Sequence, residues 1–332
     1  MSQERTQPVI RICFLVIAVL LPIGAAAIAQ DKIKLPVSVS SKTLGYSPLW
    51  VAQKQGFFAA NGLDVDLILV RSGDLALMAL LGGSVHISGG STAGISAIEK
   101  GVDLAFIGGA INGLTHMILG GKNYKSFDDL RGATIGASGL TGSTTIVLKR
   151  ILKGKGLEYP RDYKLLNVGA SAPAFLALSS NQIAASIIAV PLAFEAADLG
   201  YNILARVVDT VPSYQLGALA LKRSWGEKNR PVAVRFMKSM VQAHRWLYSQ
   251  RDAAVSFLAK EMQLSASHAR RGWEYYTEKR IWHPEADLSH EGLRMVIQIM
   301  AEEGQLRPPL PAPQKFVDQS YLKEALQELA SR

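Results

Sequence analysis

The sequence predicts an α/β fold made of two lobes, on three observations. Segments with strand character alternate with helical segments from residue 34 to about residue 206. The alternation starts again near Ala133, and only helical patterns follow Trp225. Strands that alternate with helices indicate parallel sheets covered on both faces. The roughly 300 residues that follow the first thirty also exceed the usual single core, so the two blocks indicate two lobes.

The first block begins with a strand at 37–40 and a helix that starts near Pro48. Proline suits the first turn of a helix, and Gly56 suits the position just after its end. The block continues with a strand at 65–70, a helix at 75–81, a strand at 85–88 and a helix from Thr92 to Lys100. Thr92 is expected to cap that helix at its N-terminus, and Gly101 to end it.

The second block contains the strands 133–137, 163–167 and 183–189, with helices at 142–152, at 172–179 and from Pro191 to about Asp198. The apolar, glycine-containing segment 104–119 suits a crossover strand between the lobes, and 214–221 suits the return strand. Helices are expected from Pro231 to Tyr248, from a cap at Asp252, and at 268–279, 291–303 and 318–329, with a stiff proline-rich connector at 307–313. The predicted divisions are a signal peptide (1–29), the first part of lobe 1 (30–110), lobe 2 (111–213), and a return to lobe 1 with C-terminal helices (214–332).

The first thirty residues resemble an export signal. Arg5 and Arg11 precede an apolar run at 12–23, and the small residues Ala27 and Ala29 follow it, which predicts cleavage after Ala29. The run is shorter than the roughly 20 apolar residues that span a bilayer. Cys13 is the only cysteine. A chain cleaved at this position has no thiol for disulfides, metal ligation or nucleophilic attack.

The charge and the polar motifs favour binding over catalysis. The net charge of +9 is spread along the chain without a basic block, so we expect no nucleic acid partner and a mild preference for anionic solutes. The six histidines have no metal-binding spacing, and are expected to be structural or solvated. No GxSxG elbow occurs. We therefore expect no catalytic residue, no metal and no cofactor. Trp273, Tyr275, Tyr276 and Trp282 favour core packing over ligand stacking.

Ligands of open α/β sheets bind beyond the carboxyl ends of the strands, near helix N-termini. Four segments of this sequence fall there, and they supply most of the candidate ligand-binding residues. The candidates are Thr43, Leu44, Tyr46, Gly90, Ser91, Thr92, Ser138, Thr141, Gly142, Ser143, Thr144 and Pro191, with Asn112 and Tyr214 added from the two crossover segments.

The loop 138–145 is the strongest of the four segments. Its glycines allow close backbone approach, and its hydroxyls and the following helix N-terminus favour a carboxylate, sulfonate or similar oxyanion. An ordinary Ser/Thr-capped turn explains the same residue types, and that alternative stays open. Tyr46 is expected to lie over the ligand, although a turn residue packed on the surface is the alternative.

Several long motifs resemble one family. The run GYSPLWVAQKQGFFAANGLDV at 45–65, the run ALLGGSVHI at 79–87, the run SFDDLRG at 126–132 and the run FVD at 316–318 are similar to segments of the NMT1/THI5-like, sulfonate/nitrate/taurine-type periplasmic binding proteins of ABC transporters. The resemblance implies a two-lobe type II periplasmic-binding-protein fold with two crossover strands and a helical C-terminal region. It implies a monomer in the periplasm that delivers a small molecule to an ABC permease and its ATPase.

The same resemblance places the family's ligand loops on Tyr46, on residues 90–92 and on residues 141–144. Ala189 and Val190 stand where alkanesulfonate binders of this family often carry an aromatic-acidic pair, so an apolar wall is expected there and alkanesulfonate is not assumed. His86, Ala185 and Asn181 are further departures. A thiamine-pyrimidine enzyme of the same fold is the alternative function, but the cysteine-rich segment of those relatives is absent. A binding protein that serves a sensor or a tripartite carrier also remains open.

Overall fold

The computed structural model describes residues 32–70, 72–92, 94–140 and 143–331, without the side chains of Ser91 and Ser143. The predicted signal peptide, its cleavage position and Cys13 lie outside these residues. No helix within them is both long enough and apolar enough to cross a membrane.

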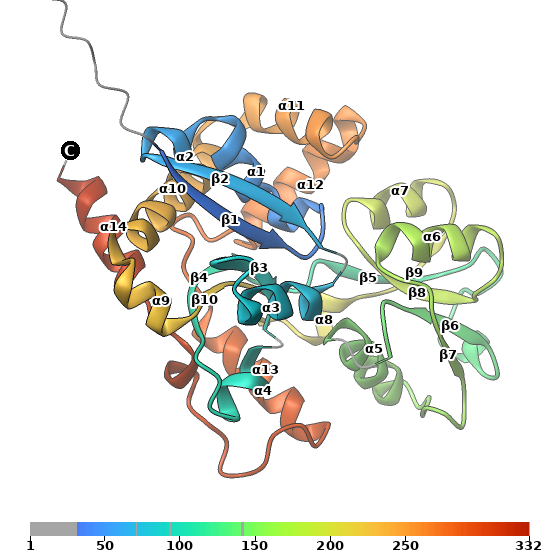
Figure 1. The fold of residues 1–332 in the computed structure, drawn as a ribbon. Helices are drawn as coiled ribbons and strands as arrows, with labels where there is room; N and C mark the ends of the chain where they lie inside the picture. Colours follow the sequence, from blue (N-terminus) through green and yellow to red (C-terminus); the bar gives the residue numbers. More distant parts are fainter. Residues whose placement is uncertain (1–31, 71, 93, 141–142, 332) are drawn as a thin grey trace, which may run out of the picture. The chain divides into compact units, whose positions relative to one another are not determined.

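Lobe 1 is built on a five-stranded mixed sheet in the order β2-β1-β3-β10-β4 (Figure 1). Its strands are β1 (Ile33–Val39), β2 (Leu63–Leu69), β3 (Ile87–Ser91), β4 (Ala105–Ile111) and β10 (Gly217–Leu221). Its connections contain the 3-10 turn η1 (Leu44–Tyr46) and the helices α1 (Ser47–Lys54), α2 (Phe57–Ala60), α3 (Gly73–Gly82) and α4 (Gly94–Glu99).

Lobe 2 repeats this plan with a second five-stranded sheet in the order β7-β6-β8-β5-β9. Its strands are β5 (His116–Gly120), β6 (Thr134–Ala137), β7 (Lys164–Asn167), β8 (Ala185–Ala189) and β9 (Asn202–Arg206). Its helical elements are η2 (Asp128–Leu130), α5 (Ser143–Gly154), α6 (Ser171–Ser179), α7 (Leu192–Asp198) and α8 (Val207–Thr210).

The expectation of parallel sheets is wrong for one strand in each lobe. β10 is antiparallel to β3 and β4, and β5 is antiparallel to β8 and β9. β4 and β9 each end at the boundary between the lobes, where the chain crosses. The strand that follows each crossing therefore starts at this boundary and runs away from it, opposite to the strands that end there.

The two crossovers, at 112–115 and 207–216, are tied together by amide side chains. Gln215 is fully buried and donates through Nε2 to Asn112 Oδ1 at 2.8 Å. Asn112 Nδ2 donates in turn to the Asp287 carbonyl at 2.7 Å, and Gln215 Oε1 accepts from the Ser289 backbone N–H at 2.8 Å. Buried polar groups need such partners. This network fixes both links between the lobes to residues 287–289.

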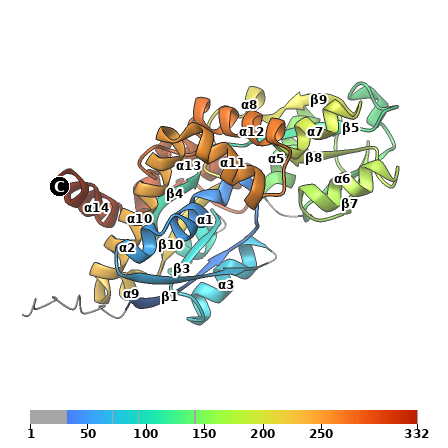
Figure 2. The ribbon, with the colours of Figure 1, turned by 90° about the horizontal axis from the view of Figure 1, so that it is seen from above.

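The C-terminal helices are α9 (Arg223–Lys228), α10 (Arg230–Ser249), α11 (Arg251–Glu261), α12 (Ala266–Glu278), α13 (His290–Glu302) and α14 (Ser320–Ala330), with the 3-10 turn η3 (Pro313–Phe316). α10 packs on α1, α2 and α14, so these helices complete lobe 1. Figure 2 shows α12 reaching across toward α7 of lobe 2. Asp198 of α7 pairs there with Arg271 at 2.6 Å and His268 at 3.1 Å.

Local turn chemistry accounts for most element ends. Pro48 lies in the first turn of α1, and Gly56, Gly83 and Gly101 adopt positive φ angles of 77°, 79° and 84° after helices. The Thr92 hydroxyl donates to the Gln215 carbonyl at 3.1 Å, so it ties the end of β3 to the second crossover.

The cap of one helix differs from the expectation, and two elements were not expected. Asp252 lies in the first turn of α11, and Gln250 occupies the capping position. β9 and α8 had no predicted counterpart; they occupy the segment that leads into the second crossover.

Candidate functional site

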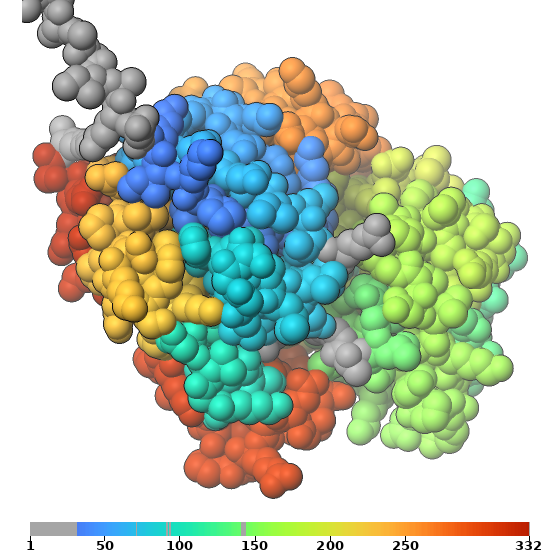
Figure 3. All heavy atoms as spheres, viewed as in Figure 1, coloured from blue at the N-terminus to red at the C-terminus, as the bar shows by residue number. Residues whose placement is uncertain are grey.

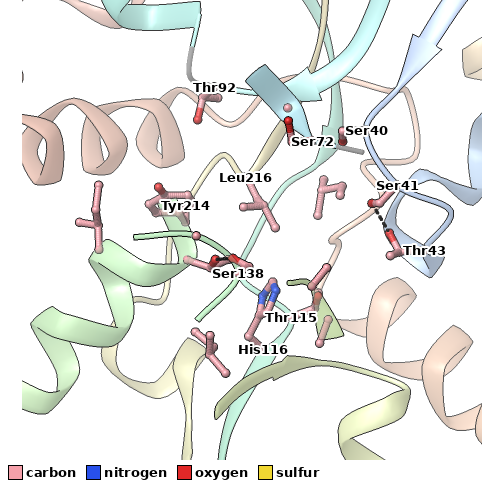
Figure 4. A pocket seen from close by; sticks show the side chains of 18 of the residues that line it. Ser40, Ser41, Thr43, Ser72, Thr92, Thr115, His116, Ser138, Tyr214 and Leu216 are labelled. Atoms are coloured by element: carbon pink, nitrogen blue, oxygen red, sulfur yellow. Dashed lines mark hydrogen bonds between the residues drawn. The ribbon is translucent and has the colours of Figure 1, made fainter. Parts of the chain in front are cut away.

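A cavity of about 580 Å³ lies between the two lobes and is lined by both of them. Figure 3 shows the surfaces of lobe 1 and lobe 2 facing each other across a furrow, and Figure 4 shows side chains of both lobes pointing into the cavity. Pockets of this size suit small-molecule ligands. The cavity therefore has the dimensions of a solute site.

Hydroxyl side chains collect at the carboxyl ends of the parallel strands. The parallel strands of both sheets end toward the cavity, so the residues just after them gather at one place. These residues are Ser40 and Ser41 after β1, Ser72 after β2, Thr92 after β3, Ser138 after β6 and Ser171 after β7. The cavity is thus rich in neutral donors and acceptors.

Three hydroxyl contacts organise this lining. Ser138 Oγ and Thr144 Oγ1 are 2.7 Å apart in lobe 2, between the end of β6 and the start of α5. Thr115 Oγ1 lies 3.1 Å from the Tyr276 hydroxyl and so joins the first crossover to α12. Ser41 Oγ and Thr43 Oγ1 are 3.4 Å apart, and a dashed line marks this contact in Figure 4. Each pair can reorient its protons toward a ligand oxygen.

Two tyrosines present neutral phenols to the cavity. Burial raises the pKa of Tyr46 to about 12, although a hydrogen bond with Ser40 opposes this effect. Burial also raises the pKa of Tyr276, whose ring centroid is 4.6 Å from that of Trp282. Both phenols are protonated at neutral pH and can donate hydrogen bonds. Tyr276, expected to serve core packing, thus also lines the cavity.

His116 is the histidine in this cavity, although the sequence favoured a structural or solvated role for it. It begins β5, directly after Thr115. Burial lowers the pKa of its imidazole to about 4, so the ring is neutral at pH 7 in the empty protein. Asp74, at the start of α3, is the only carboxylate among the described lining residues, and none of those residues is lysine or arginine.

Most of the remaining lining is apolar, although Ser96 and Gln305 also contribute to it. The apolar side chains come from the end of β4, the second crossover, lobe 2 and α13: Ile111, Ile146, Ile187, Ala189, Leu216, Val296, Ile299 and Met300. Ala189 lines the cavity and Val190 is buried beside it, as expected for an apolar wall at the end of β8. The site therefore combines a hydroxyl-rich region with a hydrophobic one.

The structure brings part of the predicted set together. The cavity is lined by Thr43, Tyr46, Thr92, Ser138, Thr144 and Tyr214. It is not lined by Leu44, Gly90, Asn112 or Pro191, and the amide of Asn112 serves the crossover network instead. Thr141 and Gly142 lie outside the described residues, as do the side chains of Ser91 and Ser143. The ligand role of the whole set stays a prediction.

Several lining residues had no place in the predicted set. Ser40, Ser72 and Ser171 lie within four residues of a strand end, and the rule that ligands bind at strand ends could have found them. His116 and Tyr276 carry no such signal, because they meet only through the crossover and the packing of α12. Within the described part of the chain, no group of three or more His, Cys, Asp or Glu side chains could hold a metal ion.

Comparisons with known proteins agree on family and fold. A model of the NMT1/THI5-like family matches residues 23–254. YtlA of Bacillus subtilis (strain 168), provisionally named as a binding protein, is 24% identical over 305 residues, which is 89% of this chain and 91% of that protein.

Two solved structures show the same fold. The alkanesulfonate-binding protein SsuA of Xanthomonas axonopodis pv. citri, bound to MOPS, superposes with a TM-score of 0.67 at 20% identity and covers 86% of this chain and 98% of its own. The periplasmic nitrate-binding protein NrtA of Synechocystis PCC 6803 has a TM-score of 0.73 at 15% identity, covering 92% of this chain and 91% of its own.

Proposed function

The chain belongs to the NMT1/THI5-like family, and from this membership and the cavity we propose that it is a non-catalytic solute-binding protein of an ABC importer. It captures a small organic acid between its lobes and presents it to the permease and ATPase. It acts as an exported, periplasmic monomer. The observation that carries the proposal is the cavity between two lobes that are joined by two crossovers, with strand-end hydroxyls from both.

The proposed ligand class follows from the two halves of the lining. Hydroxyls and backbone N–H groups at the ends of strands and starts of helices suit an oxyanion. The aliphatic wall suits an apolar body attached to it. The names of SsuA and NrtA, a sulfonate binder and a nitrate binder, support an anionic ligand. The hydrophobic wall favours an organic acid over nitrate.

A thermal-shift screen of carboxylates, sulfonates, nitrate and pyrimidines tests the proposed function. A ligand at 100 times its dissociation constant stabilises the folded state by about 2.7 kcal/mol. We expect organic acids to raise the melting temperature and pyrimidines to leave it unchanged. A clear shift with pyrimidines alone would favour the thiamine-precursor alternative, and no shift with any compound would contradict solute capture.

The pair formed by Ser138 and Thr144 gives a sharper prediction at single residues. If these hydroxyls donate to the acidic group, Thr144→Val and Ser138→Ala each remove a hydrogen bond to a charged acceptor, which costs about 1.5 to 3 kcal/mol. The dissociation constant of the screened acid should rise about tenfold to a hundredfold. Titration calorimetry measures this change, and the melting temperature of the empty variant should stay near that of the wild type.

Thr145 provides the matched control for this prediction. Its side chain is fully buried, and its hydroxyl donates to the Gly139 carbonyl at 2.5 Å, so it supports the loop from inside. Thr145→Val should reduce the free energy of unfolding of the empty protein by about 1 kcal/mol or more, and so lower its melting temperature. Unchanged affinity in both Thr144→Val and Ser138→Ala would mean that the ligand binds elsewhere.

A further inference from the structure

His116 is placed to contact a solute in the cavity. It occupies the first position of β5, opposite Ala189 of β8, and both residues line the cavity. Figure 4 shows its imidazole beside Ser138 and Thr115, between the two lobes. Its Nδ1 atom is buried and has no hydrogen-bond partner among the described residues. A buried polar atom without a partner is costly, so occupation of the cavity can relieve this cost.

An anion that enters the cavity meets no fixed positive charge on the described lining. Asp74 contributes a negative charge, and the phenols of Tyr46 and Tyr276 are neutral. Tyr214, on the second crossover, is the remaining tyrosine of the lining. His116 is thus the one described lining side chain that can become a cation near neutral pH.

The elements packed against β5 add no charge that sets the state of this imidazole. β8 has no charged residue, while β9 carries Arg206 and α8 carries Asp209. Those two charges act on Tyr275, whereas burial is the only cause of the lowered pKa of His116.

α7 is the remaining element packed against β5, and it carries Glu195 and Asp198. Asp198 is paired with Arg271 and His268 of α12. The protonation of His116 therefore depends on burial and on what occupies the cavity.

Charge balance links the solute to a proton. A buried anion without a counter-ion is unfavourable, and an imidazolium beside an anion is favoured over an isolated one. An opposite charge within about 4 to 6 Å raises the pKa of a histidine by one to several units. The two unfavourable states, a desolvated anion and an imidazolium whose Nδ1 is buried, stabilise each other when they form together.

We propose that His116 recognises the acidic group of the solute, and that the anion and one proton bind together. The proton comes from solvent, is held on the imidazole while the solute is bound, and returns to solvent on release. This inference rests on the proposed function and adds the residue that recognises the acid. It predicts that affinity falls about tenfold for each unit of pH rise between the pKa values of the empty and the loaded imidazole.

The experiment uses benzenesulfonate, whose charge is constant across the range, and benzamide as an uncharged counterpart of similar shape. Titration calorimetry at about pH 5, 6, 7 and 8 should show benzenesulfonate binding that weakens about tenfold per unit up to the pKa of the loaded imidazole and levels off above it. Calorimetry at one pH in two buffers of different ionisation enthalpy should show the uptake of about one proton. Benzamide should bind more weakly and without proton uptake.

His116→Gln is the test variant, because glutamine keeps a donor but cannot take up a proton at this pH. It should weaken benzenesulfonate binding at pH 5 by about tenfold or more and abolish the pH dependence. His86→Gln is the control, since His86 stacks on Trp225 with ring centroids 4.9 Å apart and does not line the cavity. The proton-uptake measurement on the wild type does not depend on how the His116 variant folds.

Three results would overturn the inference. They are benzenesulfonate binding that is equal at pH 5 and 8 without proton uptake, tighter binding of benzamide than of benzenesulfonate, and no binding of benzenesulfonate at any pH. The first two leave the proposed function standing, because a compound still binds, and the third does so if another compound of the thermal-shift screen binds. If none binds, the proposed function fails as well.

Discussion

Trp282→Ala is expected to lower the free energy of unfolding by about 3 to 5 kcal/mol, the range for large-to-small changes at fully buried aromatic residues. Trp282 has no exposed surface and is the largest fully buried side chain described. Its ring packs against Tyr276, with centroids 4.6 Å apart. Its Nε1 donates to the Gly45 carbonyl at 3.2 Å, inside η1. Urea unfolding of the empty protein measures this loss, as a lower urea concentration at the midpoint with an unchanged dependence of the unfolding free energy on urea.

The same variant should also weaken solute binding. η1 carries Tyr46 into the cavity, and Trp282 contacts both this turn and Tyr276. Trp282→Phe is the milder variant, because it retains a buried aromatic ring while it removes the hydrogen bond to Gly45 and part of the ring volume. We expect it to cost about 1 to 3 kcal/mol.

Trp246 is the matched control for position 282. It is half-buried on α10 and packs on Phe257, with ring centroids 6.0 Å apart. Trp246→Ala should cost less than Trp282→Ala and leave affinity unchanged. Equal losses of stability at positions 246 and 282 would contradict the structural role given to Trp282.

The sequence predicts the order of elements well because local chemistry determines where elements start and stop. Pro48 suits the first turn of a helix, and glycines such as Gly56 and Gly83 accept the left-handed conformation after one. The two-lobe α/β architecture and the crossovers follow from the order of these elements. The direction of β5 and β10 does not, since it depends on where the chain crosses between sheets.

Part of the candidate site is also local in origin. Ser138, Thr92 and Thr43 follow strands, so the position of each along the chain indicates its position at the cavity edge. Asn112 illustrates the limit of this reasoning. Its place in a crossover suggested ligand contact, but the structure joins its amide to Gln215 and Asp287.

His116 and Tyr276 show why the rest of the site could not be predicted. Tyr276 reaches Thr115 across 161 residues of sequence. Such a contact requires α12 to pack against the first crossover, and no local pattern around residue 276 encodes this packing. Side chains that only tertiary structure brings together have ordinary neighbours in the sequence. His116, a lone histidine at the start of an apolar strand, is such a side chain.

Lowering the pH from neutral to 4 is expected to reduce the free energy of unfolding. The protonation of His244 alone accounts for about 3 kcal/mol of this loss. His244 lies on α10 with no exposed surface, and neither ring nitrogen has a hydrogen-bond partner among the described residues. Burial lowers its pKa from 6.5 to about 4, and the charge of the nearby His283 acts in the same direction, while a contact with the His283 backbone, too poorly aligned for a hydrogen bond, opposes it.

The sign follows from the two pKa values of His244. The unfolded chain, with the ordinary pKa of 6.5, binds a proton between about pH 6.5 and 4, whereas the folded protein does not. Stability is therefore complete above pH 6.5 and falls as the pH decreases toward 4. His116, whose pKa is also lowered to about 4, acts in the same direction in the empty protein.

His244→Leu should remove the contribution of His244 and flatten the stability profile. Urea unfolding of the empty protein at about pH 7.5, 5.5 and 4.5 should show a smaller loss in the variant than in the wild type, by about 2.5 kcal/mol at the lowest pH. His86→Gln is the control, because His86 stacks on Trp225 away from His244, and this variant should keep the wild-type profile. Profiles of wild type and His244→Leu that stay parallel down to pH 4.5 would show that the imidazole finds a proton acceptor or water in the folded state, and that its burial does not oppose protonation.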